Sequence, residues 1–377
     1  MEFEQFKAGH WRQRIQYKSF EPNPINHEWS WKEPAINTLL ESANHALGQL
    51  DAFSLIVPDV DRFIYMHIVK EAQTSSKIEG TKTGIEELLL AEEYVQPERR
   101  DDRREVLNYI EAINTAVQRL TALPLSNRLL KETHKVLLHG VRGEHRSPGE
   151  FRISQNWIGG SSLNDAAFIP PHQENVQELM SDLERFWHNE SITVPHLIRI
   201  ALTHYQFETI HPFLDGNGRI GRLLIPLYLM DQKLLSKPSL YLSAFFEKNR
   251  AAYYDALTRV RMNNDLNHWV RFFLTGIVET ATEGRDIFKK ILALRERADA
   301  TLISLGKRMA NAKKVLQLLY RFPVVDAAFL AKEMNLSLST IHILVNELER
   351  LGILEEITGQ QRGRVFRFGE YIRLFTA

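Results

Sequence analysis

Residues 211–222 bring together side chains that no packing requirement would place in one short stretch. The stretch reads His-Pro-Phe-Leu-Asp-Gly-Asn-Gly-Arg-Ile-Gly-Arg, with an imidazole, a carboxylate, three glycines, an asparagine and two guanidinium groups. Histidine can accept a proton near neutral pH, and aspartate is an oxygen ligand that Mg²⁺ takes together with phosphates. Guanidinium groups pair with phosphate oxygens in a fork-like geometry. The set therefore predicts the binding and turnover of a polyphosphate.

Each of these residues alone has an ordinary structural explanation. His211 could be a buried core histidine, residues 215–218 could form a surface turn, and the two arginines could lie on a solvated helix face. These explanations fail together, because a turn does not need the arginines and the start of a helix does not favour the glycines. We therefore prefer chemistry over coincidence for the group as a whole.

The elements that must position this stretch can be predicted from its flanks. Apolar residues recur at helical spacing in residues 195–210 and again in residues 220–230, so we expect a helix, a loop over residues 211–217 and a second helix. Gly216 and Gly218 would let the backbone take positive φ and approach a ligand closely. Free N–H groups at the start of the second helix would then bind an anion, helped by the helix dipole.

The stretch resembles the complete signature of the Fic/Doc family, whose order of His-Pro-Phe, Asp-Gly-Asn-Gly-Arg and a final Arg it repeats without departure. The resemblance implies transfer of AMP from ATP to a hydroxyl side chain of a target protein. In that case His211 would match the general base, Asp215 the Mg²⁺ ligand, and Phe213 the buried anchor that seats the loop.

The resemblance also implies how ATP would be held. Asn217 and Arg219 would contact the α- and β-phosphates, and Arg222 would contact the γ-phosphate. The residues expected to bind ATP are Gly216, Asn217, Gly218, Arg219 and Arg222. Tyr253 and Tyr254, in a later stretch that also resembles the family, could line an adenine pocket, although we expect most aromatic residues there to lie in the core.

A hairpin is expected upstream of the loop. Two short apolar runs, at residues 156–160 and 167–171, flank a turn rich in Gly, Ser and Asn. Family members carry such a hairpin as a flap over the active site, where an extended segment of the target protein could add a strand. An ordinary surface hairpin is the alternative. The flap residues would be Asn156, Trp157, Ile158, Gly159 and Gly160.

A second motif, Ser-Ser-Lys-Ile-Glu-Gly at residues 75–80, resembles the inhibitory signature of the family. Its characteristic positions are Ser75, Glu79 and Gly80, and the resemblance implies that Glu79 pairs with Arg222. An arginine held by a carboxylate cannot bind the γ-phosphate, and the carboxylate repels that phosphate. Because positioning supplies most of the catalysis in such transfers, a misplaced phosphate would silence the site. In related enzymes the same glutamate can support removal of AMP.

The alternative explanation of this motif is a helix capping box, Ser76-x-x-Glu79. Residues 62–73 already have a helical pattern, so Glu79 should lie near the end of a helix and not at its start. Thr83-x-x-Glu86, before the apolar residues 88–91, is the better capping box.

Composition sets broad limits. The 377 residues suffice for two or three domains, and the formal net charge of +0 gives no global field that would attract nucleic acid or an acidic membrane. The absence of cysteine excludes disulfides, thiolate metal sites and thiol catalysis. The acidic opening residues do not resemble a signal peptide, and no apolar run approaches the length of a membrane span. We expect a cytoplasmic protein that does not contact a membrane.

We expect an all-α fold of the Fic type with a small β-hairpin flap, followed by a C-terminal winged helix of α+β class. Residues 1–100 would form an N-terminal arm and helices that include the inhibitory motif. Residues 101–295 would form the core domain, and residues 307–377 the C-terminal domain. Related proteins form dimers through core helices, so a homodimer is a further expectation by analogy.

The C-terminal stretch predicts three helices, at residues 314–320, 326–334 and 337–351, with Asp326 as the N-cap of the second, and then two strands around a turn at residues 358–363. This order resembles a winged helix-turn-helix domain, in which the third helix would enter the major groove of DNA. That helix offers only Arg350 for phosphates, whereas the wing has Arg362, Arg364 and Arg367. We prefer a protein-docking role over DNA binding.

Two other functions compete with a self-restrained AMP transferase. One is a winged-helix DNA-binding regulator whose Fic domain only senses ATP, but sensing does not require His211. The other is a metal-dependent hydrolase that uses His204 and His211. Their spacing places them on one helical face only if the helix continues past Pro212, which proline opposes.

Overall fold

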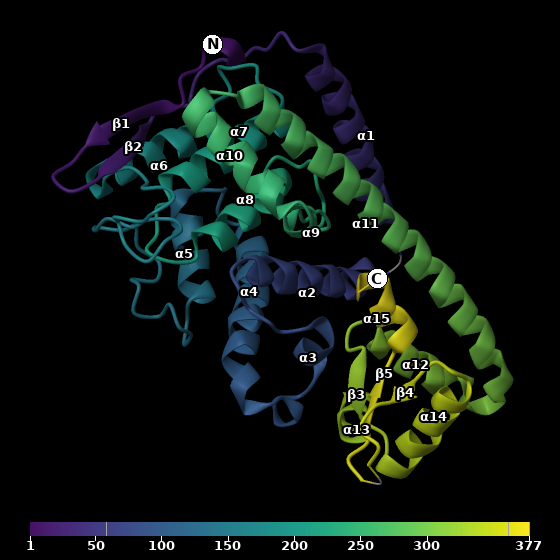
Figure 1. The fold of residues 1–377 in the computed structure, drawn as a ribbon. Coiled ribbons are helices and arrows are strands. Elements are labelled where there is room, and N and C mark those ends of the chain that lie inside the picture. Colours follow the sequence, from purple (N-terminus) through teal and green to yellow (C-terminus); the bar gives the residue numbers. More distant parts are fainter. Residues whose placement is uncertain (58, 361, 377) are drawn as a thin grey trace.

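The computed structural model describes residues 1–57, 59–360 and 362–376, and most of them lie in helices (Figure 1). The expected mainly helical fold is confirmed. The helices are α1 (Pro34–Ile56), α2 (Val60–Ile78), α3 (Ile85–Leu89), α4 (Arg100–Arg119), α5 (Asn127–Leu137), α6 (Gln173–His188), α7 (His196–Ile210), α8 (Asn217–Asp231), α9 (Ser243–Lys248), α10 (Arg250–Asn263), α11 (Leu266–Leu302), α12 (Met309–Leu319), α13 (Ala327–Met334), α14 (Leu338–Arg350) and α15 (Gly369–Thr376). The strands are β1 (Gly9–Gln13), β2 (Lys18–Pro22), β3 (Val324–Asp326), β4 (Glu355–Glu356) and β5 (Val365–Arg367).

Helix α7 lies at the centre of the core. Every residue of α7 after His196 is buried, and α8 is buried along most of its length. A helix that is enclosed on all sides must pack against several neighbours, and α7 contacts α6, α8 and α11. The loop between α7 and α8 is therefore held between two helices that are packed into the core.

Helix α11 connects the core to the C-terminal part of the chain (Figure 1). Its 37 residues span about 55 Å, and α1 runs beside it over much of that length. None of the described helices is long and apolar enough to cross a lipid bilayer.

Helix α2 packs against α4 and α9 and carries the inhibitory motif at its C-terminal end. Glu79 caps the end of this helix, as the helical pattern before it predicted. The predicted capping box at Thr83 is wrong, because α3 begins after Gly84 and has no side-chain cap. Thr83 is almost fully buried, so its hydroxyl faces the interior and not the start of the helix.

The first thirty residues pack on the core, as expected, but they also form a hairpin that the sequence did not predict. Strands β1 and β2 pair antiparallel, and the turn is closed by a hydrogen bond from Arg14 N to Tyr17 O. Four of the five residues of β1 are exposed, which explains why no alternation of apolar and polar residues marks it. Strand β2 lies against the segment that follows residue 167, through a hydrogen bond from Phe20 N to Ile169 O.

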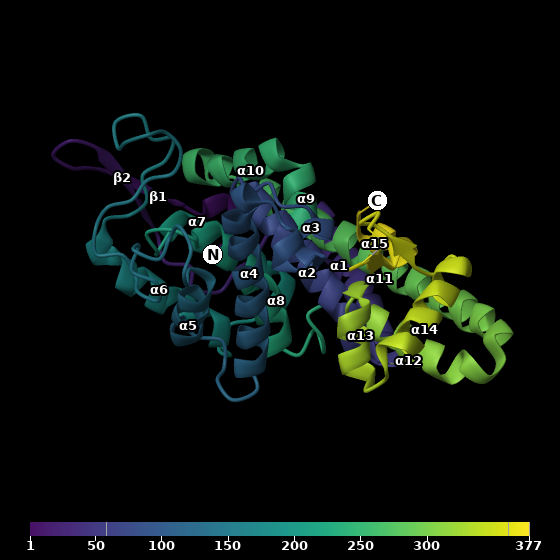
Figure 2. The ribbon, with the colours of Figure 1, turned by 90° about the horizontal axis from the view of Figure 1, so that it is seen from below.

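The C-terminal part of the chain lies at the far end of α11, on one side of the core (Figure 2). It contains the three predicted helices, α12 to α14, and a three-stranded antiparallel sheet in the order β3-β5-β4. Asp326 caps α13 by accepting a hydrogen bond from Phe329 N, as predicted, and Ser337 caps α14 in the same way. We call residues 309–376 the C-terminal module; its identity as a winged helix and the domain limits stay predictions.

Candidate active site

The loop between α7 and α8 has the predicted form over residues 211–216. His211 ends α7 with a left-handed backbone (φ 51°), and Gly216 precedes α8 with φ 74°. Gly218 differs from the expectation, because it lies in the first turn of α8 and does not have positive φ. A side chain is excluded there for another reason, since a Cβ atom would lie 2.3 Å from Glu79 Oε1.

The loop is closed by its own side chains. Asn217 Oδ1 accepts a hydrogen bond from Phe213 N, and Asn217 Nδ2 donates to Phe213 O, both at 2.8 Å. Phe213 is fully buried and stacks on His134, with ring centroids 3.9 Å apart. Phe213 therefore anchors the loop as expected, and the amide of Asn217 is used within the loop.

The two arginines of the motif lie in different surroundings. Arg219 is buried next to Glu105, with 3.5 Å between Nη1 and Oε2, and its Nη2 lies 3.7 Å from Asp215 Oδ1. Arg222 points instead toward the end of α2. Its Nε donates to Ser75 Oγ at 2.8 Å, and its Nη2 donates to Ser75 O at 2.9 Å.

The ion pair between Arg222 and Glu79 is present, with 2.7 Å between Nη2 and Oε1. The Arg222 side chain is 2% exposed and that of Glu79 is 38% exposed. Burial opposes charge on both groups, but their attraction is stronger, so the pKa of Glu79 is lowered and the pKa of Arg222 is raised. Both groups are charged at neutral pH in this arrangement.

A cavity of about 280 Å³ opens at the start of α8 and brings most of the predicted groups together. Arg219 does not line it. The lining residues are Glu79, Asn156, Trp157, Ile158, Glu208, His211, Leu214, Asp215, Gly216, Asn217, Gly218, Arg222, Tyr253, Tyr254, Leu257 and Arg261. Tyr253 and Tyr254 both line the cavity; the Tyr253 side chain is otherwise buried in the core, whereas Tyr254 is 44% exposed.

His211 is held as a neutral imidazole. Burial lowers its pKa to about 3, and the nearby guanidinium groups of Arg152 and Arg261 act in the same direction. Its Nδ1 atom is buried and has no hydrogen-bond partner among the described residues. A neutral imidazole with a free nitrogen can accept a proton at neutral pH.

The predicted flap folds back antiparallel, but through a single bridge instead of two strands. Ile158 N donates to Phe168 O at 2.8 Å, and Phe168 N donates to Ile158 O at 3.1 Å. Pairing is limited on one side because Gly159 and Gly160 both have positive φ. It is limited on the other by the prolines after Ile169, which lack an N–H group.

Asn156, at the start of this segment, is buried and faces the loop. Its Nδ2 donates to His211 O at 3.1 Å and to Phe213 O at 2.8 Å. Trp157 is 39% exposed and lines the cavity. The segment therefore supports the loop with one side chain and presents the next to solvent.

Three residues near His211 were not singled out from the sequence. Arg152 Nε donates to His211 O at 2.9 Å, and Arg261 Nη2 donates to Glu208 O at 3.1 Å. Burial raises the pKa of Glu208 to about 7, and this carboxyl faces Gly221, where a Cβ would lie 2.2 Å from its Oε1. Glu208 lies one helical turn before His211, so its proximity could have been predicted from the sequence. Arg261 is distant in sequence, and no local pattern links it to His211.

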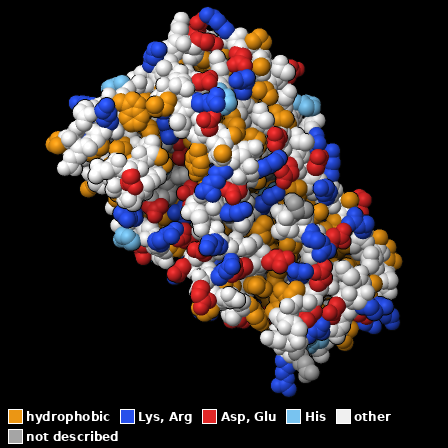
Figure 3. Space-filling view, viewed as in Figure 1, with side chains coloured by type: hydrophobic (Ala, Val, Ile, Leu, Met, Phe, Trp, Pro, Cys, Tyr) orange, Lys and Arg blue, Asp and Glu red, His pale blue; other side chains and the backbone are white. Residues whose placement is uncertain are grey.

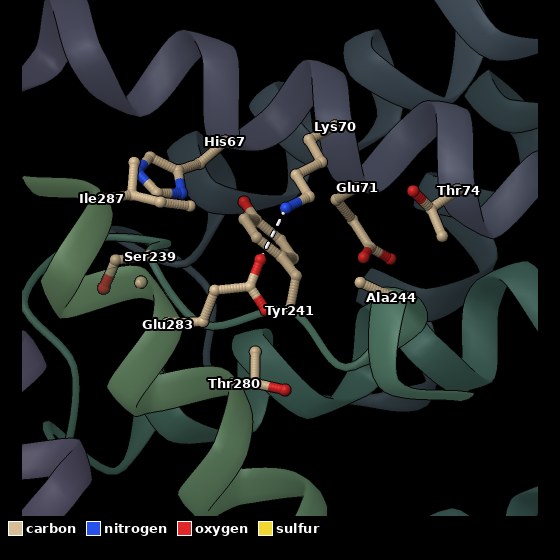
Figure 4. A pocket seen from close by; sticks show the side chains of 11 residues that line it. His67, Lys70, Glu71, Thr74, Ser239, Tyr241, Ala244, Thr280, Glu283 and Ile287 are labelled. Atoms are coloured by element: carbon tan, nitrogen blue, oxygen red, sulfur yellow. Dashed lines mark hydrogen bonds and ion pairs between the residues drawn. The ribbon is translucent and has the colours of Figure 1, made fainter. Parts of the chain in front are cut away.

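A network of buried polar side chains is centred on Glu71 of α2. Glu71 Oε1 accepts hydrogen bonds from Tyr109 at 3.0 Å and from Ser243 at 2.6 Å, and burial raises the pKa of Glu71 to about 7. Glu71 also lines a small cavity between α2 and α11, across which Lys70 pairs with Glu283 (Figure 4). Because α9 and α11 close this cavity, α2 is fixed along the turns that precede Glu79.

The hydrolase alternative is not supported by the geometry. His204 is fully buried, with Gly221 O 2.9 Å from Nδ1 and the Tyr253 hydroxyl 2.9 Å from Nε2, so neither ring nitrogen is free. Among the described residues, no group of three or more His, Asp or Glu side chains is placed to hold a metal ion.

Comparisons with known proteins agree with this geometry. Residues 124–229 match the Fic/DOC family model, and residues 37–118 match the model of the Fic/DOC family N-terminal region. The chain is 35% identical over 125 residues to a protein adenylyltransferase Fic of Drosophila erecta, and 35% identical over 144 residues to one of Culex quinquefasciatus. The matches cover 33% and 38% of this chain, but only 22% and 26% of those relatives.

Two solved structures have a similar fold. A Fic family protein from Desulfovibrio desulfuricans G20 gives a TM-score of 0.56 at 20% identity, with 89% of this chain and 96% of that chain covered. A Fic domain containing signaling protein from Bacteroides thetaiotaomicron gives 0.54 at 18% identity, with 68% and 97% covered. The loop at His211 lies within residues 124–229, the part of the chain that matches the Fic/DOC family model.

Proposed function

We propose that this protein is an adenylyltransferase that moves AMP from ATP to a hydroxyl side chain of a target protein. The observation that carries the proposal is the cavity at the start of α8, where a neutral imidazole, a carboxylate and a buried guanidinium face one space. Two relatives that bear the name protein adenylyltransferase support it.

In the proposed reaction, His211 accepts the proton of the attacking hydroxyl. The hydroxyl oxygen forms a bond to the α-phosphorus, the bond from that phosphorus to the bridging oxygen breaks, and diphosphate leaves. Because burial lowers the pKa of His211 to about 3, the imidazole is unprotonated at neutral pH before the reaction begins. Arg152 and Asn156 both donate hydrogen bonds to the carbonyl of His211, so they position the base through its backbone.

The phosphates would lie at the N-terminus of α8. The first N–H groups of a helix have no partner within it, and none is found among the described residues for Asn217, Gly218 or Arg219. These N–H groups would hold the α- and β-phosphates. Direct contacts from the side chains of Asn217 and Arg219 would require them to leave Phe213 and Glu105.

Asp215 fits the role of a Mg²⁺ ligand. Its side chain is 41% exposed, lines the cavity, and uses Oδ1 for Gly216 N, which leaves Oδ2 without a hydrogen bond to another described residue. One carboxylate with substrate phosphates is a donor set that Mg²⁺ favours. When bound, the ion would neutralise charge that develops on the phosphate oxygens.

We propose that Glu79 restrains this activity in two ways. It engages Arg222, the expected partner of the γ-phosphate, and its carboxylate lies directly over Gly218 in the first turn of α8. The anion-binding helix start is therefore occupied by an anion of the protein itself. Ser75 also holds Arg222 by accepting a hydrogen bond from its Nε, and the chain changes direction at Gly80, where φ is 104°. The same carboxylate could position a water molecule for removal of AMP.

The target protein would bind along residues 156–160, next to the exposed Trp157, with main-chain pairing at the free edge. A homodimer through core helices and a location in the cytoplasm remain part of the proposal. For the C-terminal module we prefer protein docking to a DNA-binding regulator. Arg364 pairs with Glu349, and Arg367 with Glu355 and Glu86, so the wing has less charge available for phosphates.

Intact mass spectrometry after incubation with ATP and Mg²⁺ tests the proposal. Glu79→Gly should gain the mass of one or more AMP groups on itself or on added protein, whereas wild type should gain much less. Glu93→Gly, which removes an exposed carboxylate from the same part of the chain, should behave like wild type.

The outcomes separate the two parts of the proposal. Equal AMP transfer by Glu79→Gly and wild type would reject the restraint and leave the transferase. Addition of a phosphate or another group in place of AMP would reject the transferase itself.

A further inference from the structure

A second cavity, of about 360 Å³, lies where the C-terminal module meets α3. One wall is formed by Leu88 and Leu89, and the opposite wall by Phe322, Val324 and Phe329. Hydrophobic side chains reach the surface here, between α3 and β3 (Figure 3). Its size falls within the range of pockets that bind small molecules, roughly 300–1,000 Å³.

Two guanidinium groups line the same cavity. Arg103 and Arg321 converge on Tyr65, another lining residue, and both lower the pKa of its hydroxyl against the stronger effect of burial. Arg103 donates to backbone carbonyls, including Leu90 O at 2.6 Å, and Arg321 lies 5.2 Å from the ring centroid of Phe322. Within the described part of the chain, neither arginine forms an ion pair with a carboxylate.

The charge at this cavity is therefore positive. Asp326 is the one carboxylate in its lining, and its Oδ1 caps α13 by accepting from Phe329 N at 2.7 Å. Two arginines and one carboxylate, which is already hydrogen-bonded, leave an excess of one positive charge beside an apolar surface. Such a combination recognises a molecule with an apolar body and an acidic group.

We propose that this cavity is a binding site for a small amphipathic anion. The apolar body would lie between the leucines of α3 and the phenylalanines of the module, and the acidic group would face Arg103 and Arg321. The site is separate from the ATP cavity, and the inference does not depend on the proposed transferase activity.

The position of the cavity gives the ligand a structural effect. Few polar contacts join its two walls: Arg367 Nη1 pairs with Glu86 at 2.8 Å, and Tyr94 donates to Gly363 O at 3.4 Å. Both are exposed and contribute little. A ligand that bridges the walls would fix α3, which begins shortly after Glu79, against the C-terminal module.

A fluorescence titration of the full chain with anilinonaphthalene sulfonate tests the site. We expect one saturable site in wild type and about tenfold weaker binding in Arg321→Glu, because a charge-assisted contact to the sulfonate is replaced by repulsion. The matched control is Arg350→Glu, the same charge change on an exposed residue of the same module. It should bind like wild type.

Two further measurements locate the site. The uncharged analogue phenylnaphthylamine should bind wild type and Arg321→Glu equally, which would show that the apolar walls are intact. Ala91→Trp, at an exposed lining residue, should fill the cavity and remove both dyes. Equal sulfonate binding by Arg321→Glu and Arg350→Glu, or retention of both dyes in a folded Ala91→Trp, would overturn the proposal.

Discussion

At the scale of single residues, the site depends on how His211 is enclosed. Its backbone carbonyl accepts hydrogen bonds from Arg152 and Asn156, and its partly buried ring, whose Nδ1 is fully buried, lies near two guanidinium groups. This enclosure fixes the position of the ring and keeps it neutral at the same time. A solvent-exposed histidine with an ordinary pKa would be partly protonated at physiological pH and would not have a fixed orientation.

His211→Ala in the Glu79→Gly background should lower the rate of AMP transfer by about 10²–10⁴-fold, because the proton acceptor is removed. Binding of a fluorescent ATP analogue should change little, since the N–H groups of α8 and Arg222 remain. The comparison variant is His139→Ala, which removes a largely exposed imidazole. Transfer at the level of the parent variant would mean that another group accepts the proton.

Two glycines of the motif are required by carboxylates and not by backbone conformation. Gly218 makes room for Glu79, and Gly221 makes room for Glu208. In each case a Cβ would lie closer than 2.4 Å to a carboxylate oxygen, at 2.3 and 2.2 Å. Glycine is therefore needed at these two positions because carboxylates from outside the motif occupy the space of a side chain.

At the scale of elements, α2 determines whether Glu79 can reach Arg222. The helix ends beside α8, and Arg250 Nη2 donates to its carbonyl at Ile78 at 2.6 Å. A cation at the C-terminus of a helix stabilises its unpaired carbonyls and interacts favourably with its dipole. The last turn of α2 is therefore held by hydrogen bonds at both Ser75 and Ile78.

Arg250→Ala, with Glu79 kept, should loosen this turn and raise the rate of AMP transfer up to about tenfold over wild type. This corresponds to a loss of ~1.4 kcal/mol from the free energy that favours the restrained state. The increase should be smaller than that of Glu79→Gly, because the ion pair itself is kept. Arg259→Ala, on the same helix, removes an arginine that pairs only with the surface residue Asp255. Steady-state transfer rates that do not differ between these two variants would show that Arg250 does not hold the restraint.

At the scale of the whole molecule, several ionisable side chains are buried and form no ion pair with another described residue. Burial raises the pKa of Glu71 and Glu208 to about 7, and lowers the pKa of His67 and His204 to about 3. The carboxyls favour the folded state at low pH and the histidines favour it at high pH, so their effects oppose each other.

Glu71→Gln should isolate one of these contributions. The folded pKa of Glu71, about 7, lies above its ordinary value of 4.5, so its contribution to stability is full below pH 4.5 and is lost as the pH rises through 7. Relative to the variant, wild type should lose up to ~1.4 kcal/mol of unfolding free energy per pH unit across this window. Urea unfolding at several pH values measures it, and pH-independent differences would contradict the buried, protonated state.

The sequence by itself determined the features that lie within one continuous stretch. The loop between α7 and α8 and the cap at Asp326 follow from residues a few positions apart, because helical period and capping are local. Phe213 as the anchor of the loop was implied by resemblance to a family. The pairing of Glu79 with Arg222 was anticipated only through resemblance to a family. No local pattern links two residues so far apart in the chain.

Only the tertiary structure decided how distant segments meet. It brought Arg152 and Arg261 to His211, turned the amide of Asn156 inward and reduced the flap to one bridge. It also paired the exposed strand β1 with the mostly buried strand β2, neither of which has an alternating pattern of burial. It also separated Arg219 from Arg222, although both lie on the first turns of one helix. Burial and charge at a residue depend on every element packed around it, and these neighbours are fixed only when the chain folds.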